Sequence, residues 1–119
     1  GFQDATLGYY QAMELLAIVS EKEGLSNAML EAMACGVPVF SHTACGGAEV
    51  LENNVTGFVC EVTGGESLAA GLESVLRNRG KLTAMGETAR ARVERHFSLQ
   101  AMADNYRSVY REAAAGKRF

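Results

Sequence analysis

The sequence lacks the features that would identify several common classes of protein. Its three cysteines form no CxxC pair and have no ligand spacing with His42 or His96, which argues against a zinc site. An odd number of cysteines fits free thiols in a reducing compartment rather than a disulfide framework. The formal net charge is −3, so no nucleic acid partner is expected. No apolar run approaches the roughly 20 residues that span a bilayer.

The length and the basic residues indicate how many domains the chain can form and what kind of surface it presents. With 119 residues, of which 48% are hydrophobic, the chain can form one compact core. It begins at Gly1 without an initiator methionine, so we expect a piece of a longer protein. We expect that protein in the cytoplasm, because the cysteine count fits a reducing compartment. Six of its eight arginines lie between Arg77 and Arg107, in a stretch that reads as helical. We expect a solvated, salt-bridged face there; the alternative is a peripheral contact with anionic lipids at the inner membrane face.

The stretch 15–40 has the pattern of a parallel βαβ unit. Residues 15–19 form an apolar run of strand length, and a loop that carries Gly24 follows them. Strong helix formers then occupy residues 28–34. After a glycine and a proline comes a second apolar run that ends at Phe40. This order predicts two parallel strands joined by a helix.

The start of the predicted helix is a candidate site for an anion. Ser26 or Asn27 can cap the helix, whose first turn offers unpaired amides and a partial positive charge. Backbone amides of residues 24–27 could therefore hold a phosphate at the carboxyl end of the first strand. Glu23 would lie over the same mouth, and Glu31 one turn inward. The alternative is that Glu31 only complements the helix dipole and that Glu23 is merely solvated.

The remainder of the chain reads as a third strand followed by helices. Residues 58–62 alternate in polarity and predict the strand. After the second strand, Gly46 and Gly47 permit a positive φ and close approach of the backbone to a ligand; the alternative is an ordinary turn. The last helix, 99–114, is predicted to face the core through an apolar stripe, namely Leu99, Met102, Tyr106, Val109 and Tyr110. Other helices are expected over residues 5–13, where Tyr9 and Tyr10 would pack, and over 66–79 and 81–96.

Several separated blocks of this sequence resemble one known family. Residues 23–39, EGLSNAMLEAMACGVPV, closely resemble the E-x7-E segment of retaining GT-B glycosyltransferases, and most of all those of family 4. The resemblance continues through residues 46–49, 54–59 and 95–98, so it extends over about residues 1–111. It implies an α/β fold with a Rossmann-like parallel sheet flanked by helices, and it makes residues 1–119 part of a GT-B C-terminal domain.

The same resemblance assigns roles to individual residues. It implies that Glu31 binds the ribose hydroxyls of a nucleotide-sugar donor. It places Glu23 beside the donor sugar, where a carboxylate could stabilise an oxocarbenium-like centre, and makes it the catalytic candidate. The diphosphate would lie on the loop and on the glycine-rich turn, that is, on Gly24, Leu25, Ser26, Asn27, Gly46 and Gly47. Neither a cofactor nor a bound metal is implied, in keeping with the lack of a clustered Asp-x-Asp.

The resemblance also shows what the chain lacks. A GT-B enzyme has two Rossmann-like domains, and a glycan or lipid-linked acceptor would bind through the missing N-terminal domain. The resemblance implies that the opening strands of the donor domain also lie outside this chain, so we expect an exposed sheet edge and no catalysis by this fragment alone. Two alternatives remain open: a sugar-nucleotide isomerase of the same architecture, and an interaction module without catalytic activity.

Overall fold

Three parallel strands form the centre of the computed structural model, which describes residues 3–20 and 23–116. They lie in the order β1 (Leu16–Ile18), β2 (Val39–His42) and β3 (Gly57–Cys60). Leu16 pairs with Val39, and Val39 pairs with Gly57. The helical elements are α1 (Leu7–Gln11), α2 (Asn27–Ala34), η1 (Thr43–Cys45), α3 (Gly47–Val50), α4 (Gly65–Arg77), η2 (Arg79–Lys81), α5 (Leu82–His96) and α6 (Leu99–Ala114). The prediction of a parallel sheet flanked by helices is confirmed.

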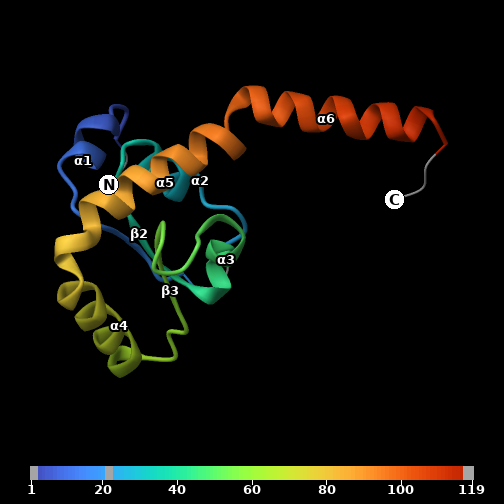
Figure 1. The fold of residues 1–119 in the computed structure, drawn as a ribbon. Coiled ribbons are helices and arrows are strands. Elements are labelled where there is room, and N and C mark those ends of the chain that lie inside the picture. Colours follow the sequence, from blue (N-terminus) through green and yellow to red (C-terminus); the bar gives the residue numbers. More distant parts are fainter. Residues whose placement is uncertain (1–2, 21–22, 117–119) are drawn as a thin grey trace.

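Two hydrophobic clusters lie on opposite faces of this sheet, because successive side chains of a strand point to opposite sides. Val39 joins the cluster that includes Met29 and Met33 of α2. Its neighbour Phe40 joins the other cluster, which includes Val75 of α4. α2 and α5 pack against each other on the first face, and α4 covers the second (Figure 1). β2 is therefore buried on both faces, as expected for the central strand of a parallel sheet.

The third strand is shorter than the sequence predicts, because it ends at Cys60 rather than at residue 62. The N–H of Val62 does not continue the strand ladder. It donates to Nδ1 of the His42 ring, at 3.0 Å. Residues 58–62 do alternate in polarity. The strand nevertheless stops early, because the His42 side chain at the end of β2 accepts the backbone hydrogen bond of Val62 in place of a strand carbonyl.

The prediction for α6 is wrong in one respect. The helix forms, and the Oγ of Ser98 caps it by accepting from the N–H of Ala101 at 3.2 Å. α6 points away from the sheet, however (Figure 1), and its apolar stripe is exposed; Leu99 is 81% exposed and Tyr110 is 70% exposed. Helical spacing decides which side chains share a face, whereas the bend between α5 and α6 decides what that face meets.

Three of the arginines form exposed salt bridges of the kind predicted for this region, one on each of α4, α5 and α6. Arg77, Arg90 and Arg107 each pair with a carboxylate three or four residues away on the same helix, and all three side chains are exposed. Such pairs add little stability. Arg92 differs, because only 25% of its side chain is exposed and its partners, Val50 and Glu52, do not lie on its own helix.

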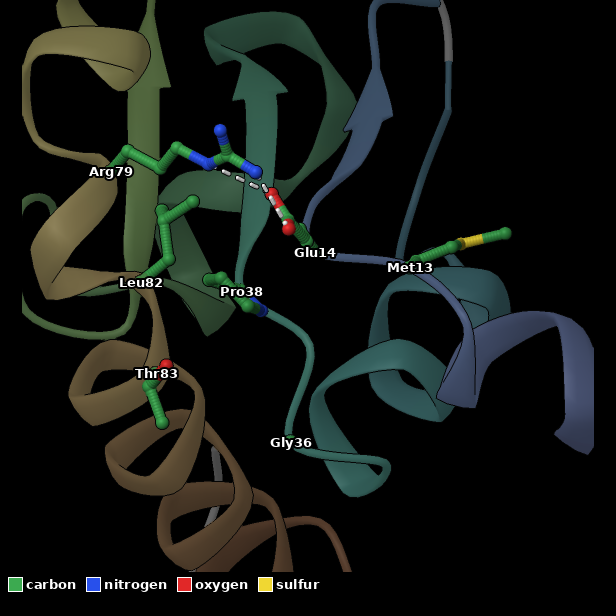
Figure 2. A pocket seen from close by; sticks show the side chains of 7 residues that line it. All are labelled: Met13, Glu14, Gly36, Pro38, Arg79, Leu82 and Thr83. Carbon is green, nitrogen blue, oxygen red and sulfur yellow. Dashed lines mark hydrogen bonds and ion pairs between the residues drawn. The ribbon is translucent and has the colours of Figure 1, made fainter.

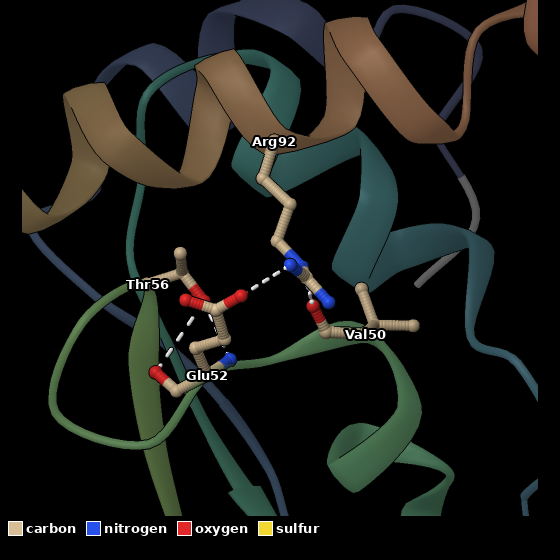
Figure 3. A network of polar contacts seen from close by, with 4 residues as sticks. All are labelled: Val50, Glu52, Thr56 and Arg92. Atoms are coloured by element: carbon tan, nitrogen blue, oxygen red, sulfur yellow. Dashed lines mark hydrogen bonds and ion pairs between the residues drawn. The ribbon is translucent and has the colours of Figure 1, made fainter.

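Arg92 fixes the connection between α3 and β3 onto α5 (Figure 3). Its Nε–H donates to the carbonyl oxygen of Val50 at 2.6 Å, and Nη1 lies 2.5 Å from Oε1 of Glu52. The N–H of Glu52 in turn donates to Oγ1 of the buried Thr56, at 2.8 Å. One guanidinium thus satisfies both a backbone carbonyl and a carboxylate.

We expect Arg92→Met to lower the free energy of unfolding by about 1–2 kcal/mol, because it leaves the Val50 carbonyl without its donor while keeping most of the apolar stem. Urea unfolding of the variant and the wild type measures this change. Arg90→Met is the matched control, since it removes an exposed pair from the same helix and should leave the midpoint unchanged. Equal effects of the two substitutions would contradict the special role of Arg92.

Candidate functional site

Two loops meet at the carboxyl ends of β1 and β2. The first joins β1 to α2 and carries Gly24, and the second follows β2 and carries Gly46. Gly46 has a φ of 64°, so the positive φ considered for this turn is found at this glycine. A Cβ atom at Gly46 would lie 2.8 Å from the carbonyl oxygen of Gly24. The two backbones are therefore in direct contact, although these residues lie 22 positions apart in the sequence.

Gly47 extends this close packing toward the sheet. It begins α3, and a Cβ atom there would lie 2.5 Å from the Oγ of Ser41. Ser41 is completely buried in β2. Both glycines thus occupy positions where a side chain has no room, so neither is an ordinary surface turn residue.

Cys45 links the turn after β2 to the loop after β1 by a hydrogen bond, a role that the sequence did not reveal. It is fully buried. Its Sγ–H donates to the carbonyl oxygen of Ser20 at 2.7 Å and lies 3.7 Å from that of Ile18. Nothing in the spacing of the cysteines could have indicated this, because the contact joins residues 25 and 27 positions apart. Cys45 therefore supports the geometry of the loop that leads to Glu23.

The start of α2 lies beside this junction. Ser26, one of the two predicted candidates, occupies the N-cap position, but its side chain makes no capping hydrogen bond, unlike that of Ser98 at the start of α6. The sequence therefore predicts where the helix begins, whereas the predicted side-chain hydrogen bond to the first turn is not formed. A helix start without a side-chain cap retains its partial positive charge and its need for an acceptor.

The two glutamates of the predicted site are both exposed. Glu23 lines a shallow depression along β1 and the start of α2, together with Ser26 and Ala28. Glu31 lies one turn into α2 and lines a different groove, which it shares with Tyr10 of α1. Glu23, in the loop before α2, and Glu31, on α2, thus line two different grooves. That both carboxylates border one mouth stays a prediction.

A further groove, of about 380 Å³, lies near the amino ends of β1 and β2 (Figure 2). Its charged groups are already paired, because Nε and Nη2 of Arg79 donate to the two carboxylate oxygens of Glu14, at 3.1 and 2.9 Å. The hydrogen bond and charge of Arg79 lower the pKa of Glu14 below its usual value. This groove lies at the other end of the strands from the two loops, so it is not part of the candidate site.

Two further observations concern the described part of the chain. No three histidine, cysteine or acidic side chains there are grouped so that they could hold a metal ion. No helix among residues 3–20 and 23–116 is both long and apolar enough to cross a membrane.

Known proteins have sequences similar to that of this chain. The N-acetyl-alpha-D-glucosaminyl L-malate synthase of Bacillus anthracis is 33% identical over 110 residues, which are 92% of this chain and 29% of that protein. The capsular polysaccharide biosynthesis glycosyltransferase CapM of Staphylococcus aureus is 28% identical over 104 residues, 87% of this chain and 27% of CapM. The chain therefore spans less than a third of the length of these relatives.

Solved structures of glycosyltransferases are similar to this chain in fold. The sucrose-phosphate synthase of Thermosynechococcus elongatus superposes with a TM-score of 0.78 at 27% identity, over 92% of this chain and 27% of that one. HepE of Anabaena, solved in complex with UDP-glucose, superposes with a TM-score of 0.70 at 25% identity, over 87% of this chain and 30% of HepE. These neighbours have the Rossmann-like fold of GT-B glycosyltransferases.

The match to a family covers most of the chain. The model of the family described as "Glycosyl transferases group 1" matches residues 1–92. That range includes the whole parallel sheet, both loops at its carboxyl end and most of α5. It leaves out α6, the helix that points away from the sheet. This chain belongs to the glycosyl transferases group 1 family.

Proposed function

We propose that this chain forms the donor-binding part of a retaining, family 4-like GT-B glycosyltransferase. The enzyme would move a sugar from a nucleotide-sugar donor to a glycan or lipid-linked acceptor. The observation that carries this proposal is the contact between the Gly24 loop and the Gly46 turn beside the uncapped start of α2. Relatives add support, since HepE was solved with UDP and with UDP-glucose.

The proposed binding mode follows from the charges at this junction. A diphosphate needs hydrogen-bond donors and positive charge, and the first turn of α2 supplies both. Its amides would act together with the backbone of Gly24, Leu25, Ser26, Asn27, Gly46 and Gly47. A donor held there would extend its ribose toward Glu31, whose carboxylate can accept from two neighbouring hydroxyls. The sugar would extend toward the loop of Glu23.

Glu23 is the proposed catalytic residue. Loss of the nucleoside diphosphate leaves positive charge on the anomeric carbon, and a nearby carboxylate lowers the energy of that transition state. The amides at the start of α2 would at the same time stabilise the negative charge on the departing diphosphate. We propose no metal and no cofactor for this step.

The remaining parts of the proposal concern the whole protein. Because the chain spans less than a third of its curated relatives, we propose that the acceptor binds to an N-terminal domain outside residues 1–119 and that this chain alone does not catalyse transfer. We place the enzyme in the cytoplasm, and its arginines are candidates for a peripheral contact with anionic lipid at the inner membrane face.

We expect Glu31→Ala, in the full-length protein, to weaken binding of the nucleoside diphosphate by about 1–3 kcal/mol, or about 5- to 150-fold in Kd, through the loss of hydroxyl contacts. Calorimetry with UDP, ADP and GDP measures this change. Glu87→Ala is the matched control, because Glu87 is another exposed helical glutamate, located on α5, and its removal should leave Kd unchanged. An unaltered Kd in Glu31→Ala would contradict the assigned role of this carboxylate.

Two other functions make different predictions. A sugar-nucleotide isomerase of the same architecture would convert its substrate without an acceptor, whereas a transferase releases the nucleoside diphosphate only as the acceptor is glycosylated. An interaction module without catalytic activity would bind no nucleotide in the same calorimetric panel. Incubating the full-length protein with a nucleotide sugar, with and without acceptor extract, distinguishes the first two.

A further inference from the structure

The turn after β2 holds the loop after β1 at two different points, through the consecutive residues Cys45 and Gly46. The Sγ–H of Cys45 donates to the carbonyl oxygen of Ser20 at 2.7 Å. At Gly46 the two backbones touch, since a Cβ atom there would lie 2.8 Å from the carbonyl oxygen of Gly24. In the sequence Glu23 lies between these points, three residues after Ser20 and directly before Gly24. The proposed catalytic carboxylate is therefore carried by a segment that is attached on both sides.

Cys45 is a firm support for the first of these points. It ends η1, and its side chain is fully buried in the cluster that includes Ile18 and Met29. Its sulfur also lies 3.7 Å from the carbonyl oxygen of Ile18, the last residue of β1. A side chain that is packed on all sides cannot follow the loop if the loop moves. The hydrogen bond therefore joins the start of the loop to the core.

Packing does not hold the start of the loop in the same way. Val19 is 40% exposed, and Ser20 is exposed as well. Exposed residues bury little surface, so their position depends on the hydrogen bonds of their backbone, and the thiol of Cys45 donates one of these. The other end of the loop does not depend on the thiol, because the contact between Gly46 and Gly24 involves backbone atoms.

We propose that Cys45 is a positioning residue for Glu23, and that its thiol proton rather than its volume fixes the start of the loop. The inference rests on the proposed function, in which Glu23 stabilises the charge on the anomeric carbon. A carboxylate does so only at the right distance, and a displacement of about 1 Å can cost a factor of about 100 in rate. Binding of the nucleoside diphosphate depends instead on Glu31 and the start of α2. Removing the thiol should therefore slow transfer more than it weakens donor binding.

The test compares Cys45→Ala with Cys45→Ser in the full-length protein. The two variants leave nearly the same space beside the loop, but only serine keeps a donor for the Ser20 carbonyl. Transfer is followed as release of nucleoside diphosphate from a panel of UDP-, ADP- and GDP-linked sugars, with acceptor extract. We expect kcat to fall about 10- to 100-fold in Cys45→Ala and to stay within about 3-fold of wild type in Cys45→Ser. Kd for whichever of UDP, ADP and GDP binds most tightly, measured by calorimetry, should change less than about 2-fold in both.

Cys60 supplies the matched control, because it is a partly buried cysteine that packs against the cluster on the other face of the sheet. Cys60→Ala and Cys60→Ser should therefore have the same kcat. Melting temperatures are measured beside the rates, and the rates are compared where all variants remain folded. If Cys45→Ala does not fold, Cys45→Val takes its place, since valine fills the space without supplying a donor.

Two results would overturn the role of Cys45. One is an equal kcat in the alanine and serine variants, and the other is a loss of affinity in Cys45→Ala as large as its loss of kcat. A failure of the proposed function is distinguishable from both. It would show as a wild type that binds none of the three nucleoside diphosphates or releases none from the panel, and the inference would fall with it.

Discussion

Gly86→Ala should lower the free energy of unfolding by about 3 kcal/mol or more, even though alanine is the better helix former. Gly86 lies in α5, where a Cβ atom would overlap the carbonyl oxygen of Gly36, just after α2. The gain in helix propensity is at most about 1 kcal/mol. Overpacking typically costs about 1–3 kcal/mol, and more when the obstructing atom belongs to the backbone and cannot rotate away. The steric term therefore outweighs the propensity term.

The surroundings of Gly86 leave little room for relief. Ala32 and Met33 of α2 and Ala89 of α5 are fully buried, so a shift of α5 would separate well-packed surfaces. Gly8→Ala is the matched control, since Gly8 is also helical and a Cβ atom there would have nothing within 4 Å. It should leave stability unchanged or raise it by up to about 1 kcal/mol. Urea unfolding compares the two variants, and equal stability would mean that α5 does not approach Gly36 as closely as described.

On the proposed function, Gly46→Ala should reduce glycosyl transfer by the full-length protein about 100-fold. Alanine at a φ of 64° has a conformational cost of roughly 1–2 kcal/mol, and its Cβ atom would also lie 2.8 Å from the carbonyl oxygen of Gly24. The least costly response is a displacement of the loop that carries Glu23. A displacement of about 1 Å in a positioning loop can cost a factor of about 100 in rate, which is the basis of the expected magnitude.

The assay for this variant is product formation from a nucleotide sugar, measured beside the melting temperature. Gly80→Ala is the control, because Gly80 lies in η2 and a Cβ atom there would meet nothing within 4 Å. It should leave both quantities unchanged. Gly46→Ala should lose far more activity than Gly80→Ala at a temperature where both remain folded. Full activity in Gly46→Ala would show that the two loops are not coupled as the contact between them suggests.

Some features of this protein follow from its local sequence. The helix formers at residues 28–34 specify α2, and the apolar runs on either side specify β1 and β2. The pattern also narrows the N-cap position of α2 to Ser26 or Asn27 and permits a positive φ at Gly46 or Gly47; the structure has Ser26 and Gly46 in these places. These features could be predicted because each depends on backbone preferences within a few residues.

Other features were settled only by the tertiary structure. The apolar stripe of α6 has the spacing of a core helix, yet it lies exposed because the chain bends after α5. The contact of Gly46 with Gly24 and the hydrogen bond from Cys45 to Ser20 each join residues more than 20 positions apart. The groove shared by Tyr10 and Glu31 likewise depends on how α1 lies against α2. Periodicity fixes which residues share a face, whereas the packing of whole elements decides which faces meet, and that packing depends on contacts distant in sequence.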